Sequence, residues 1–214
     1  QGDFSENFDQ YKDKFSPCPP DINKFIYNCA SILQVLNINL RDSIKIFNRL
    51  IDISMITKKN FDPSLFLILS SLNIRDNEIY AMFKAQKVDK TRIQFLSDEI
   101  NLTFDLSRKT TGVSTFITSE YNSNSRYTND YNSKTIKVNL ADYIKTAQYI
   151  IEIEEPETAL HSGNYPEPWM NGGITAEQTL ENFLKIGWAS RKRYESSLNL
   201  SQYYDFIELS TTFE

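Results

Sequence analysis

One amphipathic segment constrains the fold of this 214-residue chain more than any other. Between Leu40 and Ile56, apolar residues recur every three or four positions, which is the repeat of an α-helix with one buried face. Asn39 is the expected N-cap, and Asp42 stands where the second member of a capping box belongs. The sequence therefore predicts a helix over 40–56. The residues expected on its buried face are Leu40, Ile44, Phe47 and Ile51, widened by Ile46, Leu50 and Ile53.

Most of the remaining sequence also has helical periodicity. Pro20 opens one expected helix, and the pair Asp62-Pro63 is expected to cap another. Asn199 and Ser201 are suitable N-caps for a last apolar segment. The helices expected besides 40–56 cover residues 20–36, 64–72, 76–87, 91–106, 140–153, 176–186, 188–198 and 203–209. The predicted fold is mainly α, a helical bundle with a second, smaller helical lobe.

A change of composition divides the chain into three predicted parts. Residues 1–107 form a helical, lid-like domain, 108–138 a loop or linker rich in Tyr, Asn and Ser, and 139–214 a C-terminal helical lobe. A short strand over 113–118 is an option within the linker. Its aromatic residues would suit stacking on nucleic-acid bases beside a cation, although the linker lacks a basic background. The residues concerned are Tyr121, Arg126, Tyr127 and Tyr131.

The segment around Asn39-Leu40-Arg41-Asp42 and Asn48-Arg49-Leu50 resembles a motif of P-loop NTPases. It is similar to the N-L-R-D…N-R-L segment in their helical C-terminal part, above all in the KAP family and its AAA+ relatives. The resemblance extends over residues 8–83. It implies that Arg41 reaches across to the nucleotide, with Asp42 and Arg49 as further nucleotide-sensing residues. The alternative is a capped core helix whose Arg41 and Asp42 form a solvated pair, which would contribute only about 0–1 kcal/mol.

A P-loop itself is absent from the sequence. The motif G-x-x-x-x-G-K-[ST] is required because backbone N–H groups wrap the phosphates while lysine supplies charge. None of the six glycines is followed by Lys-Ser or Lys-Thr. We therefore expect no ATP hydrolysis by this chain alone. The resemblance implies ATP and Mg²⁺ only through an NTPase core, either preceding Gln1 in the same protein or contributed by another protein.

A second run, from Tyr149 to His161, resembles another ATPase motif. It is similar to the strand and Glu-Glu-Pro-Glu-Thr-x-Leu-His sequence of ABC-type and overcoming-lysogenization-defect ATPases. That resemblance would make Glu154 and Glu155 Walker-B-like residues that hold magnesium and activate water. The alternative is an acidic helix end that runs into a proline-rich loop.

Charge and cysteine content exclude several classes of function. The net charge is −5 and the isoelectric point near 5.1, so no global attraction to nucleic acid or anionic lipid is expected. No apolar run is long enough to span a bilayer and no signal peptide is recognisable, which predicts a cytoplasmic protein. Cys18 and Cys29 are expected to be thiols, and a single histidine, His161, argues against a metal site.

Two functions from different classes follow. In the first, the chain is the non-catalytic helical C-terminal portion of a KAP-like P-loop NTPase that senses nucleotide state and relays it to a partner. The resemblance further implies a bacterial protein in anti-phage defence. In the second, the chain is a free-standing helical protein-interaction module without a nucleotide role.

Overall fold

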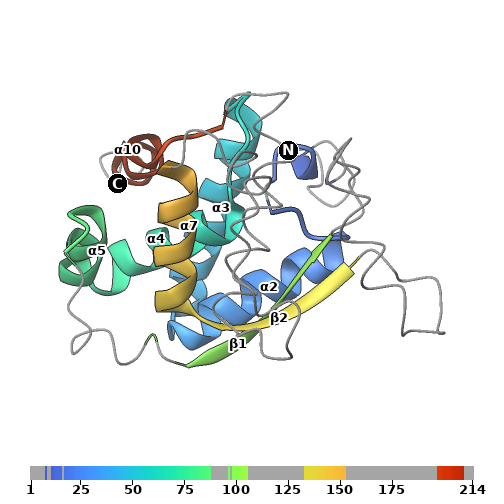
Figure 1. Cartoon of the computed structure of the whole chain (residues 1–214), viewed down its shortest axis with the longest axis horizontal. Coiled ribbons are helices and arrows are strands. Elements are labelled where there is room, and N and C mark those ends of the chain that lie inside the picture. The colour runs from blue at the N-terminus through green and yellow to red at the C-terminus, as the bar shows by residue number, and fades with distance from the viewer. Residues whose placement is uncertain are drawn as a thin grey trace, which may run out of the picture.

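The computed structural model describes residues 8, 11–15, 17–87, 96, 98–105, 133–152 and 197–209. Within them the chain forms six helices and one two-stranded antiparallel sheet (Figure 1). Most of these residues are helical, so the expected mainly α fold is confirmed. The elements are α2 (Ile22–Val35), α3 (Leu40–Ile56), α4 (Pro63–Arg75), α5 (Asn77–Lys84), β1 (Glu99–Asp105), β2 (Ser133–Asn139), α7 (Leu140–Glu152) and α10 (Leu200–Leu209).

Helix α4 is the central element of the described fold. It contacts α2, α3, α5, α7 and α10, and every residue from Pro63 to Leu72 is buried. A helix that is apolar all round must be covered on all sides, which explains why the other helices surround it (Figure 1). Buried residues from both halves of the chain, such as Phe66 and Tyr143, belong to one continuous hydrophobic core.

The predicted helix over 91–106 is wrong where the structure describes it, because Glu99–Asp105 is a strand. Apolar and polar residues alternate along β1: Ile100, Leu102 and Phe104 are buried and Glu99 and Asn101 are exposed, while Thr103 is buried on the other face. This period of two is the repeat of a strand with one covered face. Its partner β2 lies within and just after the segment 108–138, where the sequence suggested a linker; the earlier residues 106–132 lie outside the described part.

An asparagine side chain takes the place of a third strand at the free edge of β1. Asn28 of α2 donates through Nδ2 to the carbonyl of Thr103 and accepts from its N–H, both at 2.9 Å. Thr103 faces Thr135 across the sheet, and their hydroxyls are 2.9 Å apart. The amide of Asn28 therefore satisfies a buried peptide group that would otherwise lack partners.

The boundaries of several helices agree closely with the sequence prediction. The helix at 40–56 is found at those residues, and Asp62 and Asn199 accept hydrogen bonds from the first turns of α4 and α10. Cys18 and Cys29 are both buried free thiols. No helix within the described ranges is long and apolar enough to cross a membrane. The helix expected over 176–186, residues 188–196 of the helix expected over 188–198, and the strand option over 113–118 lie outside the described residues. Ser197 and Leu198 are described and are not helical, so the end of that expected helix is wrong.

Candidate functional site on helix α3

The first turn of α3 is fixed by a cap that the sequence specifies. Asn39 Oδ1 accepts the backbone N–H of Asp42 at 3.0 Å, and Asn39 Nδ2 donates to Asp42 Oδ2 at 2.6 Å. Asp42 thus takes its expected place in the cap, although it bonds the side chain of Asn39 rather than its backbone. These contacts use N–H and carboxylate groups that would otherwise face water at the helix terminus.

The turn before α3 fixes the direction of the helix. Asn37 has a positive φ of 50°, and the N–H of Ile38 donates to Leu33 O at 3.0 Å, as at the end of a helix closed by a left-handed residue. Arg75, from the end of α4, donates to the carbonyl of Leu36. The start of α3 is therefore anchored to both α2 and α4.

Arg41 lies in this first turn and is exposed. No other described residue forms a hydrogen bond or ion pair with its guanidinium, and Asp42 bonds to Asn39 instead. The solvated Arg41–Asp42 pair is therefore not formed. A cation in the first turn of a helix adds its charge to the positive end of the helix dipole, and the two together favour a nearby anion.

Arg49 does not share the position of Arg41. It is half-buried and stands eight residues further along α3, which corresponds to about 12 Å of rise and a rotation of roughly 80°. Arg49 takes part in an interaction of its own, although one guanidinium nitrogen, Nη1, is buried without a hydrogen-bond partner among the described residues. Arg41 and Asp42 therefore lie together in the first turn of α3, whereas Arg49 lies apart from them.

The expected buried face of α3 is partly wrong. The buried residues are Ile46, Leu50, Ile53 and Ser54, which face α4, whereas Phe47 and Ile51 are only half-buried. Leu40 and Ile44 are 77% and 54% exposed. The apolar positions of α3 cover more of the helix circumference than one neighbour can bury. The sequence therefore could not decide which part faces the core.

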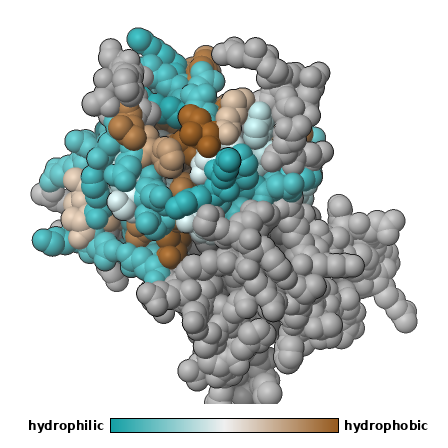
Figure 2. Space-filling model, turned by 90° about the horizontal axis from the view of Figure 1, so that it is seen from above, coloured by the Kyte–Doolittle hydropathy of each residue, from teal (hydrophilic) through white to brown (hydrophobic). Residues whose placement is uncertain are grey.

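Large apolar side chains are exposed near both ends of α3. Besides Leu40 and Ile44, Met55 and Ile56 are 51% and 72% exposed, and Ile26 is exposed on α2. Figure 2 shows apolar side chains reaching the surface among polar ones on one face of the described part of the molecule. Several exposed apolar residues on one helix side are typical of an interaction surface.

A buried carboxyl lies at the next helix start. Asp62 Oδ1 accepts the N–H groups of Ser64 and Leu65 at 2.8 and 3.0 Å, and Tyr143 of α7 donates to Oδ2 at 2.8 Å. The N–H of Asp62 donates to the hydroxyl of Tyr203 of α10 at 2.5 Å. The sequence Asp62-Pro63 predicted the cap. The two tyrosine partners of Asp62 come from distant parts of the chain, and no local sequence pattern predicts them.

Burial dominates the acid–base behaviour of this centre. It raises the pKa of Asp62 to about 7, although the three hydrogen bonds that its carboxylate accepts oppose the rise. Burial, and the nearby Asp62 carboxylate, hold the pKa values of Tyr143 and Tyr203 well above the usual value. Asp62 connects the start of α4 to α7 and α10, which are distant in sequence. It is therefore a titratable side chain with a structural role.

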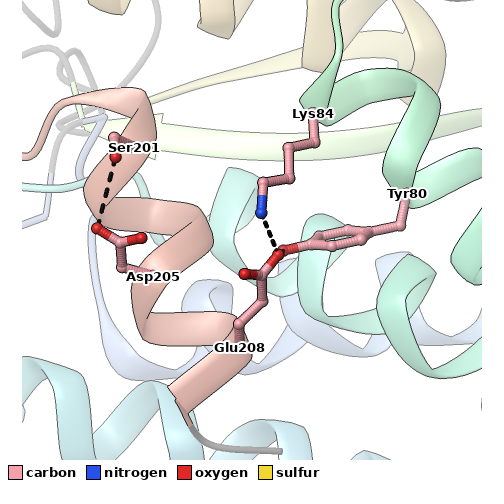
Figure 3. Close-up of polar contacts among 5 residues, drawn as sticks. All are labelled: Tyr80, Lys84, Ser201, Asp205 and Glu208. Atoms are coloured by element: carbon pink, nitrogen blue, oxygen red, sulfur yellow. Dashed lines mark hydrogen bonds and ion pairs between the residues drawn. The ribbon is translucent and has the colours of Figure 1, made fainter.

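Helix α10 is also held at its other end by polar contacts with α5 (Figure 3). Lys84 Nζ lies 2.5 Å from Glu208 Oε1, and the Tyr80 hydroxyl is 3.4 Å from the same oxygen. Gln148 of α7 donates to the hydroxyl of Tyr204 at 2.6 Å. Glu208 and Tyr204 of α10 therefore connect this helix to α5 and α7.

The other candidate residues receive no structural test. Glu154, Glu155 and His161 lie outside the described residues, as do Tyr121, Arg126, Tyr127 and Tyr131. Among the residues described, no group of three or more His, Cys, Asp and Glu side chains could hold a metal ion. No family model, curated protein or solved structure matches the chain.

Proposed function

We propose that this chain is the non-catalytic helical C-terminal portion of a KAP-like P-loop NTPase. In this proposal Arg41 senses the nucleotide held by an NTPase core, and the helices relay its state to a partner protein. ATP and Mg²⁺ bind to that core, which belongs to the same protein or to another one. The resemblance that motivates the proposal also favours a setting in bacterial anti-phage defence, in the cytoplasm.

The observation that carries the proposal is that Arg41, in the first turn of α3, is exposed and has no hydrogen-bond or ion-pair partner among the residues that the structure describes. The cap itself does not need an arginine, because α7 begins with the same arrangement. There Asn139 Oδ1 accepts from Asp142 N at 2.8 Å, with Ala141 in the place of Arg41. A cation near a helix N-terminus opposes the helix dipole but attracts an anion. Arg41 is therefore better suited to a phosphate than to stabilising its own helix.

The proposal is tested in the full-length protein encoded by the gene. We expect a G-x-x-x-x-G-K-[ST] motif in that protein or in one that co-purifies with it in stoichiometric amounts. Arg41→Ala should lower ATP turnover at least about tenfold, since an arginine on transferring phosphate commonly contributes far more. It should change the free energy of unfolding by less than about 1 kcal/mol.

Lys58→Ala is the matched control, because it removes an exposed cation just beyond the opposite end of α3. It should leave turnover unchanged, and Arg41→Lys should retain part of it. If Arg41→Ala destabilises the protein by several kcal/mol while turnover persists, Arg41 is a structural residue and the nucleotide-sensing proposal is wrong.

The second candidate is a helical protein-interaction module without a nucleotide role. The exposed apolar residues Leu40, Ile44 and Met55 favour it, because an NTPase-independent partner could cover them equally well. The two candidates differ in one measurement. Binding of a partner that is unaffected by ATP, ADP or Arg41→Ala, but is lost in Ile44→Asp, would support the module and not the sensor.

A further inference from the structure

The exposed side of α3 has two flanks of different chemistry. At 100° per residue, Leu40, Ile44 and Met55 lie on one flank together with the half-buried Ile51. The neighbouring flank is polar. Its exposed members are Arg41, Asn48 and Asp52.

Arg41 and Asp52 carry opposite charges near opposite ends of this helix. Neither forms an ion pair with another described residue, and both are exposed. They are eleven residues apart, which is about 16 Å along the axis and too far for them to pair within one helix. Neither charge has a counter-charge among the described residues. An antiparallel copy of the same helix would supply one to each, because its Asp52 would lie near Arg41 and its Arg41 near Asp52.

A two-fold axis perpendicular to α3, running beside the helix between the two copies at the level of Phe47 and Asn48, makes this surface complementary to itself. Leu40 then lies opposite Met55 of the second copy, and Ile44 opposite its Ile51. Arg41 falls within about 3 Å, along the helix axis, of Asp52 of the second copy. The same axis places the apolar flank of one copy against the apolar flank of the other, and the polar flank against the polar flank. The two ion pairs therefore form next to the apolar contact.

We propose that this face of α3 is the interface of a two-fold symmetric dimer in which α3 helices of two copies pack antiparallel. Apolar contact between the Leu40, Ile44 and Met55 flanks supplies the attraction. The paired Arg41 and Asp52 residues fix the antiparallel direction, because a parallel pairing would leave like charges at the same level. One helix pair is a small interface, so the dimer is reversible and its dissociation constant is in the micromolar range.

The dimer has a consequence that rests on the function proposed above. Arg41 cannot face a nucleotide while it pairs with Asp52 of a second copy. Self-association therefore withholds the sensing residue, and docking on an NTPase core competes with the dimer.

Sedimentation equilibrium over a concentration series tests the dimer directly. The apparent mass of the 214-residue chain should rise from 24.9 kDa towards twice that value. Arg41→Glu and Asp52→Arg should each raise the dissociation constant at least about tenfold. The double variant, which exchanges the charges, should bring it back to within about threefold of the wild type.

Lys87→Glu and Asp98→Arg are the matched controls, because they make the same charge changes at exposed positions outside α3. They should leave the dissociation constant unchanged. Ile44→Asp should abolish association, and circular dichroism should show an unchanged helix content in every variant. If Ile44→Asp does not fold, the charge-exchange series alone decides.

A chain that stays monomeric at all concentrations overturns the dimer. So does association that persists in both single charge variants, or that the double variant does not restore. These outcomes are separable from the nucleotide-sensing proposal. If the chain is monomeric but Arg41→Ala in the full-length protein lowers ATP turnover, the dimer is ruled out and the nucleotide-sensing proposal stands.

Discussion

Two helices of this protein begin with nearly the same four residues and have opposite surroundings. α3 starts at Asn39-Leu40-Arg41-Asp42 and α7 at Asn139-Leu140-Ala141-Asp142. Asn139 Nδ2 donates to Asp142 Oδ2 at 2.5 Å and Asn39 Nδ2 to Asp42 Oδ2 at 2.6 Å, so the two caps are alike. Yet Leu140 is fully buried, whereas Leu40 is 77% exposed.

The comparison separates a local property from a tertiary one. Four residues suffice to start a helix, because the cap bonds join atoms within one turn. Nothing in those residues decides whether the leucine of the motif enters the core. In α7 it does, since α4 and β2 lie against that helix, and the next residue, Ala141, is buried. In α3 the same positions face outwards, where Arg41 can meet a ligand or a partner.

The largest expected difference between the two helix starts is in the leucines. Leu140→Ala should lower the free energy of unfolding by about 3 kcal/mol, because it leaves a cavity in the core. Leu40→Ala should change it by less than about 0.5 kcal/mol. Urea denaturation of both variants measures the difference. Equal losses of unfolding free energy would show that Leu40 is buried in solution and that this face of α3 belongs to the core.

The second prediction concerns pH, because only the start of α7 is linked to a titratable core group. Burial raises the pKa of Asp62, which bonds Tyr143 of α7, from 3.8 to about 7. The folded chain therefore holds a proton between about pH 4 and 7 that the unfolded chain releases. This contribution to stability is complete below pH 4, is lost as the pH rises to about 7, and amounts to about 4 kcal/mol at about 1.4 kcal/mol per pKa unit.

Asp62→Asn should remove this dependence, since asparagine can still cap α4 but does not titrate. The difference in unfolding free energy between wild type and variant, measured by urea denaturation from pH 4 to 8, should therefore slope below pH 7 and be flat above it. Asp76→Asn is the control, because Asp76 caps α5 from a half-buried position. A flat difference curve for Asp62→Asn over the whole range would mean that Asp62 is ionised throughout and held by its hydrogen bonds.

The smallest expected effect is the one that the two helices share. Asn39→Ala and Asn139→Ala each remove the acceptor for the N–H of an aspartate in the first turn. Each should cost about 1 kcal/mol in unfolding free energy. Asn39→Ser and Asn139→Ser serve as controls that keep an acceptor for the N–H without placing a second carboxylate beside the aspartate. A loss several times larger at Asn139 than at Asn39 would show that the caps are not equivalent and that burial strengthens one of them.

Much of the helical framework was predictable because helices are specified by neighbouring residues. Asn39, Asp62-Pro63 and Asn199 mark the starts of α3, α4 and α10 in the sequence, and apolar spacing carries each helix onward. The strand at Glu99–Asp105 was missed although its alternation is visible in the sequence. A seven-residue run fits both repeats in part, and the strand depends on β2 and on Asn28, which are distant in sequence.

The candidate site was predictable only in its position on the chain. The sequence determined by itself that Arg41 stands in the first turn of a capped helix, because that arrangement depends on bonds between residues 39 and 42. Only the tertiary structure decided that α4 covers Ile46, Leu50 and Ile53, and so leaves Arg41, Ile44 and Met55 exposed. It likewise decided that Asp62 meets Tyr143 and Tyr203. Local hydrogen bonds fix a helix and its cap, whereas burial depends on which distant elements pack against it.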